Sequence, residues 1–121
     1  DAIIVKRALK MNGVNGLAIM KLDVLDSFDT IKVCVGYQVG KRTYTQPPMK
    51  LSDYDRYEPI YEEFDGWKVS TRGITRYEDL PLKAKNYLGV LEKLVETRID
   101  IISTGPERES TIMLKNPFEK L

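Results

Sequence analysis

Residues 17–26 read LAIMKLDVLD, a short continuous apolar run that gives way at once to charged side chains. The run over residues 17–20 is typical of a strand buried on both faces. Lys21 and Asp23 follow it, so two opposite charges stand at the carboxyl end of the predicted strand. In open α/β sheets, ligands bind beyond the carboxyl ends of the strands. The stretch therefore favours a ligand site at this strand end, although two solvated charges would give the same pattern.

Periodic patterns flank this stretch on both sides. Residues 2–12 place apolar side chains on one side at helical spacing, and Gly13 stands where a glycine commonly ends a helix. Residues 30–39 alternate between two faces, which predicts a strand. Gly40 marks a hairpin tip, from which residues 42–45 return antiparallel. This part of the chain therefore predicts a helix followed by strands and a β-hairpin.

The last third adds one more helix and two more strands. Pro81 opens a helical pattern that continues to Val95. Residues 99–102 and 111–114 are apolar enough for strands, and residues 103–106 break the chain between them. So few strands do not make a self-contained doubly wound sheet. We therefore expect an α/β fold that forms one edge of a larger sheet.

Residues 46–74 show no regular period and contain several prolines and glycines. The region also carries many aromatic side chains: Tyr54, Tyr57, Tyr61, Phe64 and Trp67. We expect a packed loop region with short strands, because aromatics under long loops usually form satellite core. An aromatic platform for a ligand is the alternative interpretation.

The composition describes one globular domain of 121 residues, 42% apolar and 31% charged. A formal charge of +1 gives no broad field for nucleic acid or anionic lipid. The lone Cys34 and the absence of histidine exclude an internal disulfide, Ser-His-Asp chemistry and most zinc sites. No apolar run approaches the roughly 20 residues of a membrane span, and we expect a cytoplasmic protein. Because a helical pattern begins almost at Asp1, we also expect the chain to be part of something longer.

The Lys21-Leu22-Asp23 motif has the chemistry to read a guanine base. A carboxylate offers two acceptor oxygens to the adjacent N1–H and N2–H₂ donors of guanine, a donor pair that adenine lacks. The lysine stem can cover the face of the base while its ammonium stays in water. A metal site is not expected here, because Asp23, Asp26 and Asp29 lack the glycine and terminal glutamate of a calcium loop.

The Ser103-Thr104-Gly105-Pro106 motif again follows an apolar strand directly. Glycine lets backbone N–H groups approach a ligand closely, and such donors can bind the O6 acceptor of guanine. An ordinary turn between two strands is the alternative interpretation. No glycine-rich phosphate loop occurs in the chain, so phosphate binding is not predicted.

Several blocks of the chain resemble the adenylosuccinate synthetase family, and they follow the family's order across nearly the whole length. The blocks are KLDVLD (residues 21–26) with IKVCV (31–35), EPIYE (58–62) with Gly66-Trp67, Leu80-Pro81 with Asn86-Tyr87, IDIISTGPER (99–108), and Asn116-Pro117-Phe118. Threonine commonly precedes the first block in the family, and here that residue is Met20.

The resemblance implies that residues 1–121 are the C-terminal segment of a larger, mostly parallel α/β enzyme with a G-protein-like nucleotide site. Such enzymes form adenylosuccinate from IMP, L-aspartate and GTP with magnesium, and they are homodimers. The family's guanine-binding elements carry over to six positions: Lys21, Leu22, Asp23, Ser103, Thr104 and Gly105. The phosphate loop and the catalytic aspartate and histidine would lie in a missing N-terminal part. We therefore expect no catalytic or metal-binding residue in this segment. A non-catalytic guanine-nucleotide-binding module and a structural domain without a nucleotide site are the competing interpretations.

Overall fold

The computed structural model describes residues 1–114, so the Asn116-Pro117-Phe118 block lies outside the described residues. The elements run in the order α1 (Ala2–Met11), β1 (Leu17–Ile19), η1 (Leu22–Leu25), β2 (Thr30–Val39), β3 (Arg42–Tyr44), η2 (Leu51–Arg56), β4 (Glu58–Asp65), η3 (Tyr77–Asp79), α2 (Leu82–Val95), β5 (Ile99–Ser103) and β6 (Thr111–Met113). The α/β class and the hairpin expected from the sequence are confirmed.

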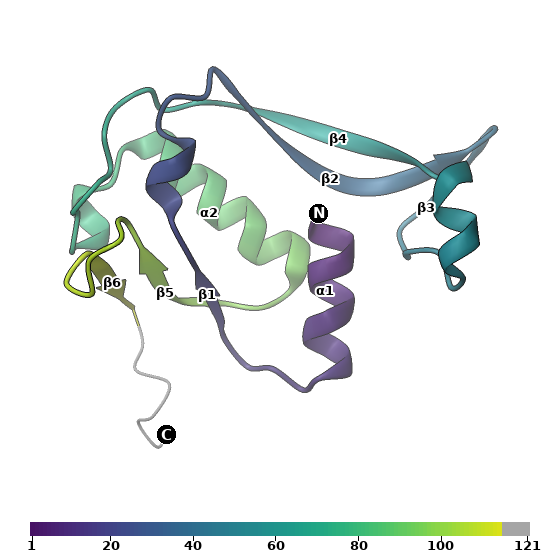
Figure 1. Ribbon diagram of the computed structural model, residues 1–121, viewed down its shortest axis with the longest axis horizontal. Coiled ribbons are helices and arrows are strands. Elements are labelled where there is room, and N and C mark those ends of the chain that lie inside the picture. The colour runs from purple at the N-terminus through teal and green to yellow at the C-terminus, as the bar shows by residue number, and fades with distance from the viewer. Residues whose placement is uncertain (115–121) are drawn as a thin grey trace.

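The strands form two three-stranded sheets, in the orders β1-β5-β6 and β3-β2-β4. In the first sheet β1 and β5 are parallel, and β6 joins β5 antiparallel. In the second sheet both pairs are antiparallel. Figure 1 shows β2 and β4 as a long twisted ribbon above both helices, with β1, β5 and β6 below. Helix α2 therefore lies between the two sheets, while α1 stands beside the first sheet.

Helix α1 begins and ends as its sequence predicts. The Asp1 carboxylate accepts hydrogen bonds from the N–H groups of Ile3 and Ile4, at 2.9 and 3.0 Å, which satisfies two donors of the first turn. Gly13 follows the helix with a φ of 62°, a conformation that favours glycine. The local sequence thus defines both ends of this helix.

Helix α2 packs against both sheets. Ala84 and Leu88, at 0% and 1% exposure, belong to the main core cluster. That cluster also contains Leu22, Ile31, Trp67, Leu80, Ile99, Ile102 and Ile112. Val95, the last residue of the helix, belongs instead to a second cluster with Ala2, Leu9 and Val33. Because α2 contributes to both clusters, it joins the two sheets through apolar contact.

Strand β4 is the main element that the sequence did not predict. Residues 46–74 were expected to be packed loops with short strands, but β4 runs for eight residues and pairs along β2. Its pattern is mostly exposed, so no apolar alternation marks it. Pro59 also argues against a strand, yet an edge strand tolerates proline because one side of its backbone needs no partner. The order β3-β2-β4 makes β4 such an edge.

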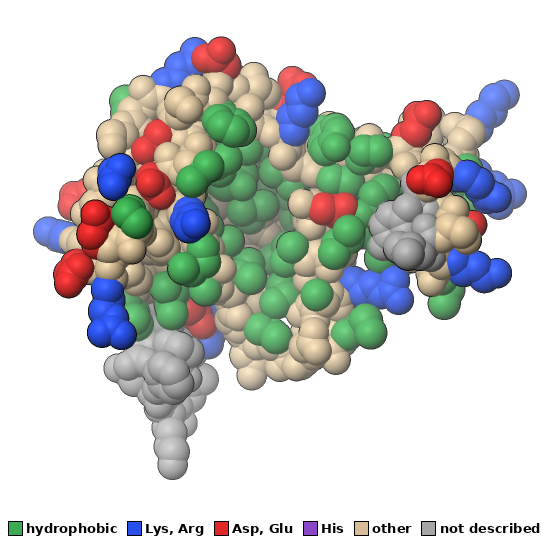
Figure 2. All heavy atoms as spheres, viewed as in Figure 1, with side chains coloured by type: hydrophobic (Ala, Val, Ile, Leu, Met, Phe, Trp, Pro, Cys, Tyr) green, Lys and Arg blue, Asp and Glu red, His purple; other side chains and the backbone are tan. Residues whose placement is uncertain are grey.

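The expectation that residues 17–20 form a strand buried on both faces is wrong within the described residues. Ala18 and Met20 are exposed, so the face of β1 that carries these alternate residues is not covered by the described part of the chain. Beside it lies an apolar groove of ≈ 400 Å³, which we call the β1 groove. Its lining is Asp1, Ala2, Val5, Leu17, Ala18, Ile19, Met20, Lys32, Val33, Tyr87, Leu91 and Val95. Figure 2 shows apolar side chains gathered in a hollow at the centre of this face.

The open edge of β1 predicts that the 121-residue chain self-associates or is only marginally stable. An unpaired strand edge beside an apolar groove invites pairing with another chain. Ala18→Lys places a charge on this edge and should shift the chain toward monomer. Thr43→Lys, which also introduces a lysine at an exposed position but on strand β3, is the control and should not shift the chain toward monomer. Analytical ultracentrifugation measures the difference; a stable monomeric parent chain with a sharp cooperative melt would contradict the prediction.

Tyr87 predicts a stability loss at alkaline pH. Its ring packs against Phe64 and Trp67, with centroids 6.2 and 5.8 Å apart, and burial raises the pKa of its hydroxyl above the usual 10.0. The stabilisation that the protonated Tyr87 hydroxyl gives is fully present below the pKa of this group in the unfolded chain. It is lost as the pH rises through the pKa in the folded protein. Tyr87→Phe should therefore flatten the fall in free energy of unfolding above about pH 10. Urea titrations from pH 8 upward measure it, with Tyr61→Phe at an exposed ring as the control; an equal effect of both changes would contradict the assignment.

Candidate functional site

The pairing of β1 with β5 brings the two sequence motifs together. The strands are parallel, and Ile19 lies opposite Ile102 at their carboxyl ends. Residues 21–23 follow β1 almost at once, and residues 103–105 close β5 and follow it. β5 also contacts η1, the short helix that holds Asp23. Each motif therefore stands at a strand end, as the sequence predicts, and the structure adds that the two strands are neighbours.

Lys21, Leu22 and Asp23 form a tight turn from β1 into η1. Lys21 adopts a left-handed conformation with φ 57° and ψ 49°, and its side chain is exposed. Leu22 is 1% exposed and anchors the turn in the main core cluster. The Lys21 carbonyl accepts from Val24 N–H at 3.1 Å, and the Asp23 carbonyl accepts from Asp26 N–H at 3.1 Å. A buried leucine thus fixes the backbone from which the two charged side chains project.

Asp23 carries an unsatisfied polar atom. Its Oδ1 is buried and accepts no hydrogen bond from any residue that the structure describes. A buried acceptor without a partner costs roughly 1–3 kcal/mol, more when it is charged. Such groups are rare in folded proteins and commonly mark a site where a ligand or water donates. This oxygen therefore lacks a donor among residues 1–114.

The loop after β5 is held by Thr104, which is fully buried. Its N–H donates to the Ser110 carbonyl at 2.8 Å, and its hydroxyl donates to the Ile74 carbonyl at 2.7 Å. The Thr104 carbonyl accepts from Gly73 N–H at 3.3 Å. Because all its polar groups are engaged within the protein, Thr104 supports the loop and does not offer its own donors to a ligand.

Ser103 and Gly105 complete this loop. The Ser103 hydroxyl donates to the Gly105 carbonyl at 3.1 Å. A Cβ on Gly105 would lie 3.1 Å from the Ser110 Cβ and Oγ and 3.2 Å from Glu107 Oε2, closer than ordinary contact. Within residues 1–114, no protein acceptor takes the Gly105 N–H. Gly105 therefore fits a confined position and keeps a backbone donor free.

Asp26 is the residue whose role sequence reasoning missed. It was considered only as a metal ligand, but its carboxylate accepts three hydrogen bonds from the segment after β4. Trp67 Nε1 and Thr71 Oγ1 donate to its Oδ1, each at 2.7 Å, and Thr71 N–H donates to its Oδ2 at 2.8 Å. A signal was present in the sequence, because a buried tryptophan usually needs an acceptor for its N–H. Among the described residues no acidic or cysteine cluster is arranged to hold a metal ion.

The aromatic side chains of residues 46–74 mainly pack on other parts of the protein. Phe64 and Trp67 contact Tyr87 of α2, and Tyr57 contacts Tyr37 and Tyr44. The Tyr54 side chain lies outside the described ones. These contacts support the satellite-core interpretation over an aromatic ligand platform.

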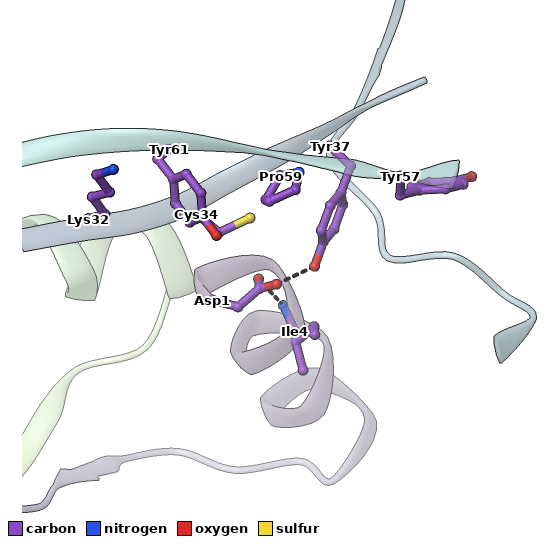
Figure 3. Close-up of a pocket in the computed structure, with 8 residues that line it drawn as sticks. All are labelled: Asp1, Ile4, Lys32, Cys34, Tyr37, Tyr57, Pro59 and Tyr61. Carbon is purple, nitrogen blue, oxygen red and sulfur yellow. Dashed lines mark hydrogen bonds between the residues drawn. The ribbon is translucent and has the colours of Figure 1, made fainter. Parts of the chain in front are cut away.

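Two further depressions lie near these elements without including Asp23 or the loop after β5. One, of ≈ 370 Å³, is lined by Ile19, Met20, Lys21, Leu22, Val24, Leu25 and Tyr87. The other, of ≈ 340 Å³, lies between α1 and the β2–β4 ribbon (Figure 3). In it the Tyr37 hydroxyl donates to the Asp1 carboxylate, which also caps α1. Met20 is 66% exposed beside the first depression, so the change from threonine does not disturb the core.

No helix among residues 1–114 is long and apolar enough to cross a membrane.

Comparison with known proteins extends over nearly the entire chain. A curated adenylosuccinate synthetase from Hahella chejuensis is 48% identical over 119 residues, and one from Thioalkalivibrio sulfidiphilus is 45% identical over 119 residues. Each alignment covers 98% of this chain and 28% of the relative, so the chain spans little more than a quarter of their length. The structure of the fully ligated adenylosuccinate synthetase from Plasmodium falciparum matches with a TM-score of 0.89 at 29% identity, covering 95% of this chain and 28% of that one. A sequence model for adenylosuccinate synthetase matches residues 1–112, and the chain therefore belongs to the adenylosuccinate synthetase family.

Proposed function

We propose that this segment supplies the guanine-recognising part of the GTP site of an adenylosuccinate synthetase. The observation that carries the proposal is the buried, unpartnered Oδ1 of Asp23 at the carboxyl end of β1, next to the end of β5. A carboxylate in that position is an acceptor that lacks a donor. Guanine supplies two adjacent donors, which a carboxylate can bind together.

The surrounding groups complement the rest of the base. The free Gly105 N–H can donate to the O6 acceptor of guanine, while Thr104 holds the loop through its own hydrogen bonds. The exposed Lys21 stem can lie over the face of the base with its ammonium in water. Ser103 contributes by fixing the Gly105 carbonyl, and Leu22 by anchoring the turn. Together these groups would distinguish guanine from adenine at both edges.

The complete enzyme would carry out the chemistry in residues outside this segment. In the proposed reaction GTP phosphorylates the 6-oxygen of IMP, which makes that oxygen a good leaving group, and the amine of L-aspartate then displaces the phosphate. This chain has no histidine and no glycine-rich phosphate loop. Magnesium, which would neutralise charge on the nucleotide phosphates, would take its protein ligands from elsewhere in the enzyme. We further propose a homodimer located in the cytoplasm.

The 121-residue chain alone should have no synthetase activity. General acid–base groups and electrostatic stabilisation supply most of the rate in such a reaction, and the segment holds neither around a phosphate. The test incubates the purified chain with IMP, L-aspartate, GTP and magnesium and follows adenylosuccinate formation. The complete Hahella chejuensis enzyme serves as the positive control. Robust turnover by the isolated chain would refute this division of roles and favour a self-contained enzyme.

Asp23→Asn in the complete enzyme should weaken GTP binding selectively. The amide keeps one acceptor and turns an NH₂ toward a guanine donor, so one hydrogen bond is lost and two donors face each other. Each effect costs on the order of 1–3 kcal/mol, so the two together raise KM for GTP by roughly 30- to 20,000-fold. The turnover number should change little, because uniform binding affects KM more than kcat. Asp29→Asn, at a side chain 86% exposed, is the matched control and should leave KM unchanged.

Xanthosine triphosphate gives the sharper form of this test. It presents a carbonyl where guanine has its 2-amine, so the new amide donor of Asp23→Asn can bind it. The variant should therefore favour XTP over GTP relative to the parent enzyme in steady-state kinetics. An unchanged GTP-to-XTP ratio would mean that Asp23 does not read the base.

A further inference from the structure

The segment of residues 67–74, called here the 67–74 loop, is hydrogen bonded to Asp26, three residues after Asp23, and to Thr104 of the second motif. At one end it donates three bonds of 2.7 to 2.8 Å to Asp26, which closes the LAIMKLDVLD stretch. At the other end it binds Thr104: the Ile74 carbonyl accepts from the Thr104 hydroxyl, and Gly73 N–H donates to the Thr104 carbonyl. The loop therefore bridges two strand ends that are far apart in the sequence.

The two ends of the bridge are themselves connected. Ile74 N–H donates to the Thr71 carbonyl at 3.1 Å, which closes a turn between the residue that binds Asp26 and the residue that binds Thr104. Thr71 and Thr104 are both 0% exposed, and Trp67 is 6% exposed. Hydrogen bonds to a charged group that are shielded from water are short and strong, and they hold one geometry. The bridge is therefore a stiff connection.

Asp26 transmits this constraint to Asp23. The two residues lie three apart, and Asp26 N–H donates to the Asp23 carbonyl at 3.1 Å. The β1–β5 pairing ends at Ile19, before η1 begins, so it does not fix Asp23 directly. Binding of two guanine donors by one carboxylate tolerates only about 0.5 Å of displacement. Leu22 anchors the turn on one side of Asp23, and the bonds of Asp26 add a polar support on the other side.

We propose that Asp26 is a positioning residue which, through the 67–74 loop, sets the placement of Asp23 relative to Gly105 and thereby the selectivity for guanine. The proposal rests on the proposed function, because it concerns the same base site. Asp26 does not touch the nucleotide in this arrangement, since both of its carboxylate oxygens are occupied by Trp67 and Thr71.

The test uses Asp26→Asn in the complete enzyme that carries this segment. Both carboxylate oxygens accept from donors, so the new NH₂ faces a donor whichever oxygen it replaces. We expect KM for GTP to rise about tenfold, while KM for IMP and kcat stay within about twofold of the parent. Inosine triphosphate keeps N1–H and O6 but lacks the 2-amine, so the preference for GTP over ITP measures the alignment of the Asp23 carboxylate. That preference should fall about tenfold in Asp26→Asn.

A pair of Thr71 variants separates positioning from folding. Thr71→Ser keeps both donors to Asp26 and should behave as the parent, whereas Thr71→Val loses the hydroxyl bond and should lower the preference for GTP over ITP part of the way. Asp65→Asn changes an exposed carboxylate just before the loop, one that forms no ion pair with the described residues, and should alter neither KM nor preference. A lower melting temperature with an unchanged GTP-to-ITP preference in Asp26→Asn would overturn the proposal. If Asp26→Asn does not fold, equal preferences for Thr71→Val and Thr71→Ser would overturn it.

Asp23→Asn measured in the same series distinguishes this proposal from the proposed function. If Asp23→Asn changes the GTP-to-XTP ratio and Asp26→Asn leaves the GTP-to-ITP preference intact, the positioning role is wrong and the guanine site stands. If Asp23→Asn changes nothing, the guanine site is wrong and the positioning role falls with it.

Discussion

The parallel pairing of β1 with β5 is the constraint on which the rest of the structure depends. Parallel strands present their carboxyl ends at the same edge of a sheet, so the residues that follow β1 and β5, Asp23 and Gly105 among them, lie at one edge. A parallel connection requires a crossover, which here contains the β2–β4 ribbon and α2. The crossover therefore allows two short motifs that are distant in the sequence to lie at neighbouring strand ends.

Helix α2 lies in that crossover and packs against both sheets. Some of its side chains also line the β1 groove. The helix buries Ala84 and Leu88 against the strands and Val95 against α1 and β2. Tyr87 and Leu91 lie between these clusters and line the β1 groove, which no described residue fills. Exposed apolar surface of this kind usually marks an interface. A chain that spans 28% of its relatives' length fits an open groove and an unpaired edge in a segment that would normally pack on more protein.

The sequence predicted the elements whose patterns are local. Both helices, the hairpin and β5 follow from periodicity, and Gly13 and Gly40 mark ends that only backbone conformation explains. Strand β4 was missed because its side chains are mostly exposed on an edge, where no alternation is required. The exposure of β1 was also missed, because an apolar run does not indicate whether other elements of the structure cover both faces of the strand. In the candidate site, both motifs could be recognised from the sequence by their residue types. The hydrogen bonds between Asp26 and Thr71 could not, because they depend on tertiary structure alone.

In the proposed guanine site, the groups that could be predicted from the sequence differ physically from those that could not. The groups that would touch the base are defined by their own chemistry, so a carboxylate or a glycine N–H is recognisable in a short motif. The groups that would fix their separation are defined by long-range geometry, as Asp26, Thr71 and Thr104 are. Recognition of a base contributes binding energy at a distance from the reacting phosphate, so it needs rigidity more than it needs acid–base groups. A segment rich in buried hydrogen bonds and without a histidine suits that task.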